Sequence, residues 1–494
     1  MDRRAFLQRA VVAGTGAAVL PSWALVAPAG AQGDGRARPG TGPYGPLRDE
    51  PDENGLLLPE GFTSRVIGVA GEPVGDTDQL WHAFPDGSAT FPTEDGGWIY
   101  TCNSEVFPWH APDSGGVTAV RFDADGEIAD AYRILDASNS NCAGGPTPWG
   151  TWLSCEENEG SGRVFECDPT GATEAVARPA MGIFAHEAVA VDEASETLYL
   201  TQDQPEGLLY RFTPDAYPDL SAGRLEACVV ADDGAVSWVA VPDPSAASAP
   251  TREQVPEATV FPGGEGIWHH ERSIYVTTKV DDRVHVIDLE AQRHRILWET
   301  DTTLDADDAV LSGVDNVTVD AGTGDLYVAE DGGNMEVVMI TPDGVVAPFL
   351  RMADPAHEGS EVTGPCFNPA RDRLYVSSQR GPSRKTVAEV IAGAEGDQTA
   401  AGITYEITGP FRGVDASAAP SPTTTIERAK ERAGSGDEGS DDGGSALPFV
   451  IGGAAVGAAA VAAAVAWRTR RTGAAAEATG APDDDQPPAT RADR

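Results

Sequence analysis

The chain has 494 residues, and its 78 acidic and 34 basic side chains give a formal net charge of −44. A surface this acidic repels DNA, RNA and anionic lipid, so the composition argues against a nucleic-acid-binding protein. The same charge keeps the chain soluble and attracts cations such as calcium.

Residues 1–31 have the pattern of a twin-arginine export signal. Arg3 and Arg4 precede a mildly apolar run, and a small-residue cleavage motif ends at Ala31. An ordinary secretory signal is the alternative interpretation. Because the twin-arginine route carries proteins that fold before export, often around a metal, this leader is a first indication of a cofactor.

The region 56–415 repeats one pattern. A short strand rich in aromatic and β-branched residues, ending in polar or charged residues, occurs at 98–105, 151–158, 197–204, 273–280, 325–332 and 373–380. Each copy is followed by a second strand, and most by a third. Four short antiparallel strands per repeat are typical of a β-propeller blade. We therefore predict an all-β, six-bladed β-propeller.

The sixth repeat lacks an outer strand of its own. The segment 63–69, TSRVIGV, has the composition of a strand and precedes the first repeat. We expect it to complete the last blade, because closing the ring removes the exposed sheet edges of an open array. A pair of stacked β-sheets is the alternative, but sandwiches do not repeat one signature six times.

Two further segments follow the repeats. Residues 416–446 are rich in Gly, Ser and acidic residues and predict a disordered acidic linker. Residues 447–467 form an uncharged run long enough to span a bilayer, with arginines directly after it. We predict a transmembrane helix there and a disordered cytoplasmic tail over 468–494, so that the exported protein is anchored at the cell surface. A loose tail is the alternative.

Acidic residues and one cysteine gather at the repeat boundaries. The first strand of a propeller blade lines the central channel, so residues that open the repeats converge on one axis. Those residues are Asn141, Cys142, His186, Glu187, Glu265, Asp315, Asn316 and Glu361. The ends of the aromatic strands add Glu105, Glu156, Glu157, Asp203, Glu330 and Asp331.

So many carboxylates around one axis predict bound metal ions. Clustered carboxylates repel one another, and burying each of them costs roughly several kcal/mol unless a cation compensates its charge. Lys279 is the one obvious cation at these positions. Oxygen ligands suit calcium, whereas a thiolate beside carboxylates indicates iron or another transition metal. The alternative is that each acid caps a turn and faces water.

These motifs resemble those of the PhoX-type alkaline phosphatase family. The most specific segment is NCAGGPTPWGTWLSCEEN at 141–158, supported by FAHEAVAVD, GEGIW, VDNVTVD and SEVTGPCFNPARDRLYVSSQ. The resemblance covers about 56–410 and the leader. It implies a phosphate monoesterase with an iron–calcium cluster in the propeller channel. By position it implies iron ligands at Cys142, Glu187 and Glu330, and calcium ligands at Asn141, Glu157, Asp203 and Glu361, with Glu265 and Asp315 as further metal ligands.

The same resemblance implies metal-assisted phosphoryl transfer, which needs no Ser–His–Asp triad. Candidates for binding the substrate phosphate are Lys279 and Arg380, with Arg272 as a third. We expect His186 to orient Glu187, and His269 and His270 either to reach the channel or to lie on the blade surface. Cys102 and Cys155 are expected to be ordinary strand residues.

Two other functions remain compatible with a propeller of this kind. One is a calcium-dependent lactonase or phytase, although such sites do not need a thiolate. The other is a non-catalytic, membrane-tethered binding propeller stabilised by calcium, because propellers host many activities. The expected partners are a small phosphorylated substrate and the membrane, and we expect a monomer that binds no nucleic acid.

Overall fold

The computed structural model describes residues 35–414. The predicted export signal (1–31), the acidic linker (416–446), the membrane helix (447–467) and the tail (468–494) lie outside the described residues. Within 35–414, no helix combines the length and the apolar character that crossing a bilayer requires.

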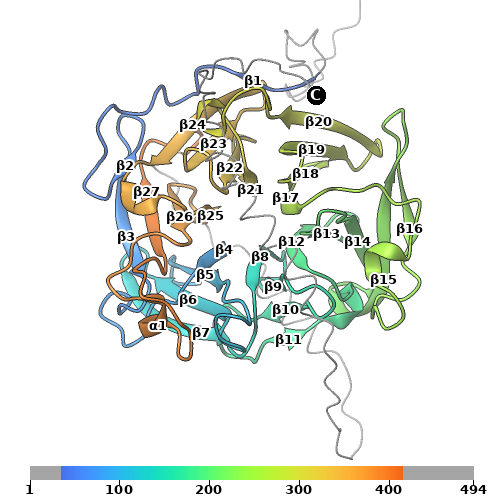
Figure 1. Cartoon of the computed structure of the whole chain (residues 1–494), viewed down its shortest axis with the longest axis horizontal. Helices are drawn as coiled ribbons and strands as arrows, with labels where there is room; N and C mark the ends of the chain where they lie inside the picture. Colours follow the sequence, from blue (N-terminus) through green and yellow to red (C-terminus); the bar gives the residue numbers. More distant parts are fainter. Residues whose placement is uncertain (1–34, 415–494) are drawn as a thin grey trace, which may run out of the picture. The chain divides into compact units, whose positions relative to one another are not determined.

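Six sheets are arranged around a central axis, as the six-bladed prediction requires (Figure 1), and their strands pair antiparallel except for one short N-terminal strand, Arg38–Pro39. The first blade contains β4 (Pro85–Pro92), β5 (Trp98–Ser104), β6 (Gly116–Phe122) and β7 (Ile128–Leu135). The second contains β8 (Asn141–Pro146), β9 (Trp152–Glu156), β10 (Val164–Cys167) and β11 (Val176–Ala177). The third contains β12 (His186–Asp192), β13 (Thr197–Gln202), β14 (Leu209–Ala216), β15 (Asp219–Val230) and a fifth strand, β16 (Val236–Ala240).

The other three blades follow in chain order. The fourth contains β17 (Gly264–His270), β18 (Ser273–Thr278), β19 (Arg283–Asp288) and β20 (Arg293–Glu299). The fifth contains β21 (Val314–Val319), β22 (Leu326–Glu330), β23 (Glu336–Ile340) and β24 (Val345–Met352), extended by β1 (Arg38–Pro39) and β2 (Leu56–Leu57). The sixth contains β25 (Val362–Phe367), β26 (Arg373–Ser378), β27 (Ile403–Thr408) and β3 (Thr63–Val69).

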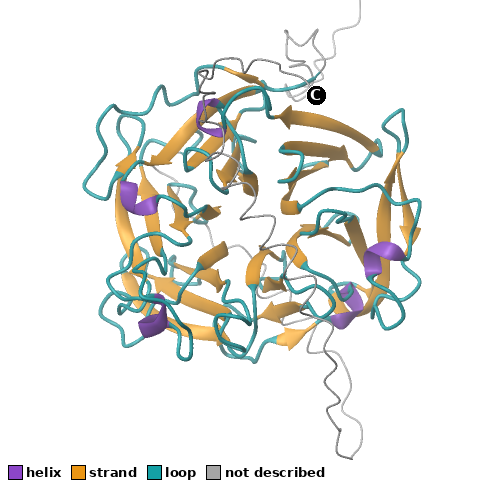
Figure 2. Cartoon of the chain, viewed as in Figure 1, coloured by secondary structure: helices purple, strands orange, loops and turns teal. Residues whose placement is uncertain are grey.

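The ring closes as the sequence predicts. The N-terminal strand β3 pairs antiparallel with β27, with Thr63 opposite Thr408 and Val69 opposite Ile403. The innermost strands β4, β8, β12, β17, β21 and β25 contact one another in a closed cycle. The short helices lie in the connections between strands (Figure 2): η1 (Pro179–Met181), η2 (Thr251–Glu253), η3 (Ala306–Asp308), η4 (Pro355–His357) and α1 (Val387–Val390).

The aromatic strands form the core because each blade is covered on both faces by its neighbours. Tyr100 of β5 and Tyr375 of β26 are fully buried, and their rings pack between adjacent blades with centroids 4.6 Å apart. Tyr327 of β22 is buried in the same way between the fifth and sixth blades. Each fully buried large apolar side chain contributes about 1.5–3 kcal/mol. This packing holds the innermost strands at fixed positions around the axis.

Candidate metal centre in the channel

A β-bulge near the start of each innermost strand directs one side chain towards the axis. The register between the first and second strands shifts between Pro85 and Ser88, Asn141 and Gly144, His186 and Val189, Gly264 and Ile267, Val314 and Val317, and Thr363 and Cys366. Bulges re-aim side chains in this way. In five blades the second residue of the strand is Asp86, Cys142, Glu187, Glu265 or Asp315, and in the sixth it is Thr363, preceded by Glu361 before the strand begins.

A glycine follows Asp86 and Glu265 because the innermost strands approach each other closely there. A Cβ atom on Gly87 would lie 2.4 Å from the Cα of Ala143 in the next blade. One on Gly266 would lie 2.5 Å from the backbone nitrogen of Val317. Real Cβ atoms do not come this near to a backbone, so glycine at these positions lets the channel be narrow and brings the acids of neighbouring blades together.

A second ring of polar side chains comes from the ends of the second strands. In each blade the first residue of the inner strand pairs with a residue that points into the blade: Ser104, Glu156, Gln202, Thr278, Glu330 or Ser378. The residue after it turns towards the axis, because successive side chains of a strand alternate. These residues are Glu105, Glu157, Asp203, Lys279, Asp331 and Gln379.

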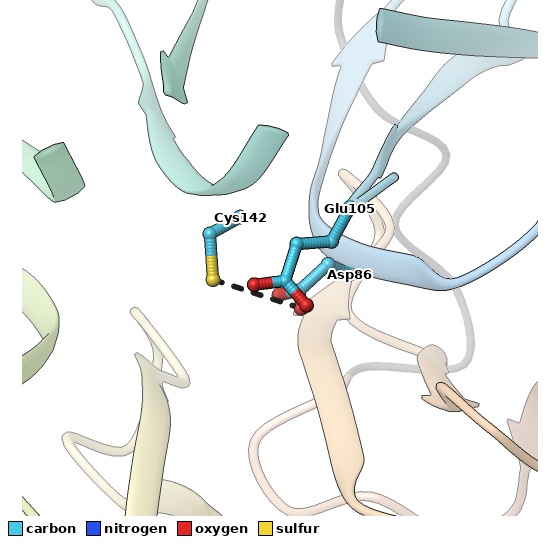
Figure 3. A group of neighbouring side chains, drawn as sticks. All are labelled: Asp86, Glu105 and Cys142. Carbon is cyan, nitrogen blue, oxygen red and sulfur yellow. Dashed lines mark hydrogen bonds between the residues drawn. The ribbon is translucent and has the colours of Figure 1, made fainter. Parts of the chain in front are cut away.

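The two rings enclose one pocket on the propeller axis. Its lining residues are Asp86, Glu105, Cys142, Glu157, Glu265, Lys279, Asp315, Asp331, Glu361 and Gln379. The side chains of Asp86, Glu105 and Cys142 point towards one another from two blades (Figure 3). The structure thus brings Cys142, Glu157, Glu265, Asp315, Glu361 and Lys279 together, as expected from the sequence.

Three groups of ligand atoms are spaced for metal ions. Within each group the ligand atoms lie within 4.8 Å of one another: Asp86 with Glu105 and Cys142, Cys142 with Glu157 and Glu187, and Glu187 with Glu265 and Asp315. The Cys142 thiol is 3.2 Å from Oε1 of Glu187 and 3.7 Å from Oδ2 of Asp86. Because Cys142 and Glu187 each belong to two groups, the three groups form one continuous arc.

Burial makes the charged forms of these acids costly. It is the main cause that raises the pKa of Asp86, Glu157, Glu187 and Asp315 well above the usual carboxyl values, and the charges of neighbouring acids raise them further. Burial and the same neighbours also raise the pKa of the Cys142 thiol. For Glu265 the effect of burial exceeds the opposing effect of Lys279, and its pKa rises to about 8.

Two basic side chains reach the rim of this cluster. Lys279 Nζ lies 2.5 Å from Oδ2 of Asp203 and 2.5 Å from Oε1 of Glu265. Arg380 forms an ion pair with Glu361 and lies 3.7 Å from Oε2 of Glu105. Within residues 35–414, no basic side chain forms an ion pair with Asp86, Glu187 or Asp315.

Buried acceptor atoms without partners indicate that a cation belongs in the cluster. Oδ1 of Asp86 and Oε2 of Glu187 accept no hydrogen bond within the described residues, and the same is true of Oδ1 of Asn141. The amide of Gln379 donates to Asp86 at 2.5 Å and to Glu105 at 2.9 Å, which fixes these two acids side by side. Unpaired oxygens beside a thiol are a donor set that suits metal ions.

The structure does not bring Glu330 into the cluster. Both of its carboxylate oxygens accept backbone N–H groups, from Ser312 at 2.9 Å and from Glu336 at 3.0 Å. The side chain of Glu330 points into its own blade and away from the channel. The following residue, Asp331, lines the pocket instead. Glu156 differs from Glu157 in the same way, because it accepts from Ser138 at 2.8 Å and from Arg163 at 3.2 Å.

The histidines and Arg272 also lie away from the pocket lining. His186 contacts the Gly182 carbonyl at 3.0 Å and packs on Phe184, so it does not orient Glu187. His269 lies 3.7 Å from Asp192 on the blade, and exposed Arg272 pairs with Asp288 and Glu290. All six cysteines are buried free thiols, as expected for Cys102 and Cys155.

The repeat pattern does not predict Asp86 and Gln379 as pocket residues, and it predicts Glu105 and Asp331 only as channel-facing acids. Asp86 stands in FPDGSATF at 84–91, where an acid followed by Gly opens a strand, as Glu265 and Gly266 do in GEGIW. That match was the available signal. Gln379 carries no such signal, since an uncharged amide at a strand end is common.

The fold and site define a six-bladed propeller whose channel carries a ring of acids and a thiol, a donor set that could hold metal ions. The sequence matches the family described as "Alkaline phosphatase PhoX" over residues 116–164, 159–296 and 289–381. The chain therefore belongs to the PhoX alkaline phosphatase family.

Solved structures with the same fold include PhoX from Pseudomonas fluorescens in complex with vanadate, a transition state analogue. That structure has a TM-score of 0.57 and 17% sequence identity, and the match covers 75% of this chain and 98% of that chain. A gluconolactonase from Xanthomonas campestris has a TM-score of 0.37 and 12% identity, over 76% of this chain and 98% of that one. A similarity at this second level carries no functional argument. No curated protein sequence matches the chain.

Proposed function

We propose that this protein is a metal-dependent phosphomonoesterase of the PhoX type, with its active centre in the propeller channel. The observation that carries the proposal is the double ring of acids around Cys142, in which one carboxylate oxygen each of Asp86 and Glu187 accepts no hydrogen bond from the described residues. Membership of the PhoX family and the fold shared with a vanadate-bound phosphatase support it.

The donor chemistry fits iron together with calcium. Cys142 and Glu187 offer a thiolate and a carboxylate within 3.2 Å of each other, which suits iron, and Asp86 and Glu105 complete that side of the arc. Oxygen donors on Glu157, Glu265, Asp315 and Glu361 suit calcium, and Asn141 and Asp203 are further candidates. We leave Glu330 out of the proposed ligand set because its oxygens cap backbone N–H groups.

Bound metal ions would polarise the phosphate and stabilise the negative charge that develops during its transfer. The chain's own residues position the substrate. Lys279, which lines the pocket, and Arg380, which pairs with Glu361, would attract a phosphate dianion towards the acidic ring. Gln379 keeps Asp86 and Glu105 in a fixed geometry.

Export by the twin-arginine route and anchoring by residues 447–467 are part of the same proposal. A substrate phosphate ester that cannot enter the cell would then be hydrolysed at the surface. Replacing Arg3 and Arg4 by lysine tests the route, and the expected result is retention of the protein in the cytoplasm. Removal of 447–494 is expected to release active protein into the medium. Normal export of the lysine variant would contradict the predicted route.

The central experiment combines metal analysis with an activity assay. The purified full chain is expected to contain iron and calcium and to hydrolyse p-nitrophenyl phosphate, and a chelator is expected to abolish the activity until both metals are restored. The proposed centre would be contradicted by a protein that contains calcium but no iron, or by one that contains zinc. Activity that survives complete metal removal would also contradict it. Calcium binding without any hydrolysis would favour a structural role for the metal.

A further inference from the structure

An exposed tryptophan stands on the loop that carries one of the pocket acids. The loop 105–115 connects β5 to β6 and begins with Glu105, which lines the pocket. Four residues later, Trp109 exposes 52% of its surface. Within residues 35–414 it is the one aromatic side chain among the exposed large apolar residues. Tryptophan is enriched at binding surfaces because its ring offers a large apolar face together with a polar N–H.

The tryptophan lies on a rigid base. Its ring stacks on Phe107 with centroids 4.1 Å apart and planes inclined by 12°. Phe107 itself is only 7% exposed. The backbone turns tightly here, since the N–H groups of His110 and Ala111 both donate to the Phe107 carbonyl. One face of the Trp109 ring is therefore fixed against Phe107, and the surface it exposes can receive a second flat ring.

The loop is held by a small core beside the pocket. Phe84, Val106, Ala111, Val387 and Ile391 pack together there, so the loop is fastened to the connection that contains α1. The Val106 carbonyl accepts the N–H of Ser140, two residues before Cys142. On the other side, Arg380 lies over the Phe84 ring at 6.0 Å and reaches Glu105 and Glu361. The same short loop thus joins the acids of the pocket to the exposed ring.

Chain length limits how far the ring stands from the pocket. The Cα atoms of Glu105 and Trp109 are four residues apart, so at most roughly 14 Å separates them even in a fully extended chain. The turn at 108–110 shortens this distance. A phosphate monoester whose phosphate enters the channel must project its leaving group out of the mouth. A ring attached to that phosphate therefore comes within reach of Trp109.

We propose that Phe107 and Trp109 form an aromatic ledge that binds the flat ring of the leaving group, so that the enzyme favours aryl and nucleoside monophosphates over aliphatic ones. This inference rests on the proposed phosphomonoesterase function. Stacking of a base on an aromatic side chain is sequence-tolerant, so the ledge selects for a ring rather than for one particular base. The net charge of −44 opposes binding of a nucleic acid chain, and a small monoester is the substrate that fits.

Trp109→Ala tests the ledge through the split between KM and kcat. KM for adenosine 5′-monophosphate and for p-nitrophenyl phosphate is expected to rise about tenfold, with kcat and the KM for glycerol 3-phosphate unchanged. Trp109→Phe is expected to restore most of the affinity. Val176→Ala is the matched control, because Val176 is 46% exposed on the outer strand β11, and it is expected to leave both substrates unaffected.

The outcomes separate the ledge from the catalytic proposal. An equal rise in KM for ring-bearing and aliphatic esters, or no rise at all, overturns the ledge while leaving the phosphatase intact. If the wild-type protein hydrolyses none of the esters, the phosphatase proposal fails. The ledge is then decided by binding of adenosine 5′-monophosphate, measured by isothermal titration calorimetry, whose signal does not depend on the tryptophan that the variant removes. Loss of that binding in Trp109→Ala, but not in Val176→Ala, supports the ledge, and unchanged binding overturns it.

Discussion

Carboxylates are buried both within the blades, away from the axis, and in the channel, but the two regions balance the negative charge differently. In the sixth blade, Glu406 is fully buried and is neutralised by Arg65 at 2.8 Å and Arg373 at 2.7 Å, with a further hydrogen bond from Tyr375. Similar pairs recur in other blades: Asp320 with Arg371, Glu226 with Arg211, Glu166 with Arg178 and Glu336 with Arg351. Away from the axis, each of these carboxylates therefore has an arginine as its counter-charge.

In the channel the acids converge on one another instead. Asp86, Glu187 and Asp315 have no basic ion-pair partner within residues 35–414, whereas Lys279 pairs with Asp203 and Glu265, and Arg380 pairs with Glu361 and Glu105. A buried carboxylate without a counter-charge is strongly unfavourable. The difference between the two regions shows that the chain can supply arginines where a fold needs neutral blades. It supplies no such partner to Asp86, Glu187 and Asp315, where we propose that a metal ion binds.

The largest effect is expected from Cys142→Ser, which removes the sulfur from the channel. Iron content is expected to fall to background and kcat/KM for p-nitrophenyl phosphate by about a thousandfold, because metal ions contribute several kcal/mol to phosphoryl transfer. Elemental analysis and steady-state kinetics measure both. The control is Cys228→Ser, which alters an equally buried thiol in the third blade and is expected to retain iron and activity. Full activity in Cys142→Ser would remove the thiol from the centre.

The next effect concerns the pH dependence of stability without metal. In the unfolded chain a glutamate has its usual pKa of 4.5, whereas in the metal-free channel that of Glu265 rises to about 8, and the pKa values of Glu187 and Asp315 also rise. The folded state therefore holds protons that the unfolded state has released. Stability is highest below about pH 4.5 with respect to these groups and is lost as the pH rises towards 8.

We expect the chelated protein to lose at least about 3 kcal/mol of unfolding free energy between pH 5 and pH 8. Denaturant titrations at the two pH values measure this loss. Metal-loaded protein is expected to show little of it, because bound cations stabilise the ionised acids. An identical pH profile with and without metal would mean that no metal ion binds among the channel acids.

A moderate effect is expected when a buried carboxylate away from the axis loses one of its arginine partners. Arg373→Met removes one partner of Glu406 and is expected to lower the free energy of unfolding by about 2 kcal/mol, because a charge-assisted hydrogen bond to a buried group is lost. Metal content and KM should not change, since this pair lies in the sixth blade outside the pocket lining. Chemical denaturation measures the stability loss. A fall in metal content would show that the two regions are coupled.

The smallest effect is expected at the acid that the structure separates from the pocket. Glu330→Gln keeps an oxygen acceptor for one of the two backbone N–H groups and is expected to cost about 1 kcal/mol of stability, with iron and calcium contents unchanged. Asp331→Asn is the paired variant, one residue along the chain, and is expected to lower metal content. If Glu330→Gln lost iron and Asp331→Asn did not, the assignment of these two neighbours would be reversed.

The sequence by itself determined the number of blades, the closing strand and four of the acids or thiols that open the blades. The strand signature repeats because each blade must bury both faces, so the pattern of aromatic and β-branched residues is visible without coordinates. Cys142, Glu187, Glu265 and Asp315 were identified because an inner strand always lies on the axis. Those inferences depend only on local pattern and on the closed topology.

Only the tertiary structure decided that Asp331, and not its neighbour Glu330, faces the axis. Glu157 and Asp331 line the pocket, whereas Glu156 and Glu330 turn into their blades. Side-chain direction alternates along a strand, so a shift of one residue in the pairing reverses it. Here the pairing is set by the bulge between the innermost and second strands of each blade. That register depends on contacts between segments far apart in the chain. For this reason the spacing of the acids indicated a metal centre, and the folded ring selected its members.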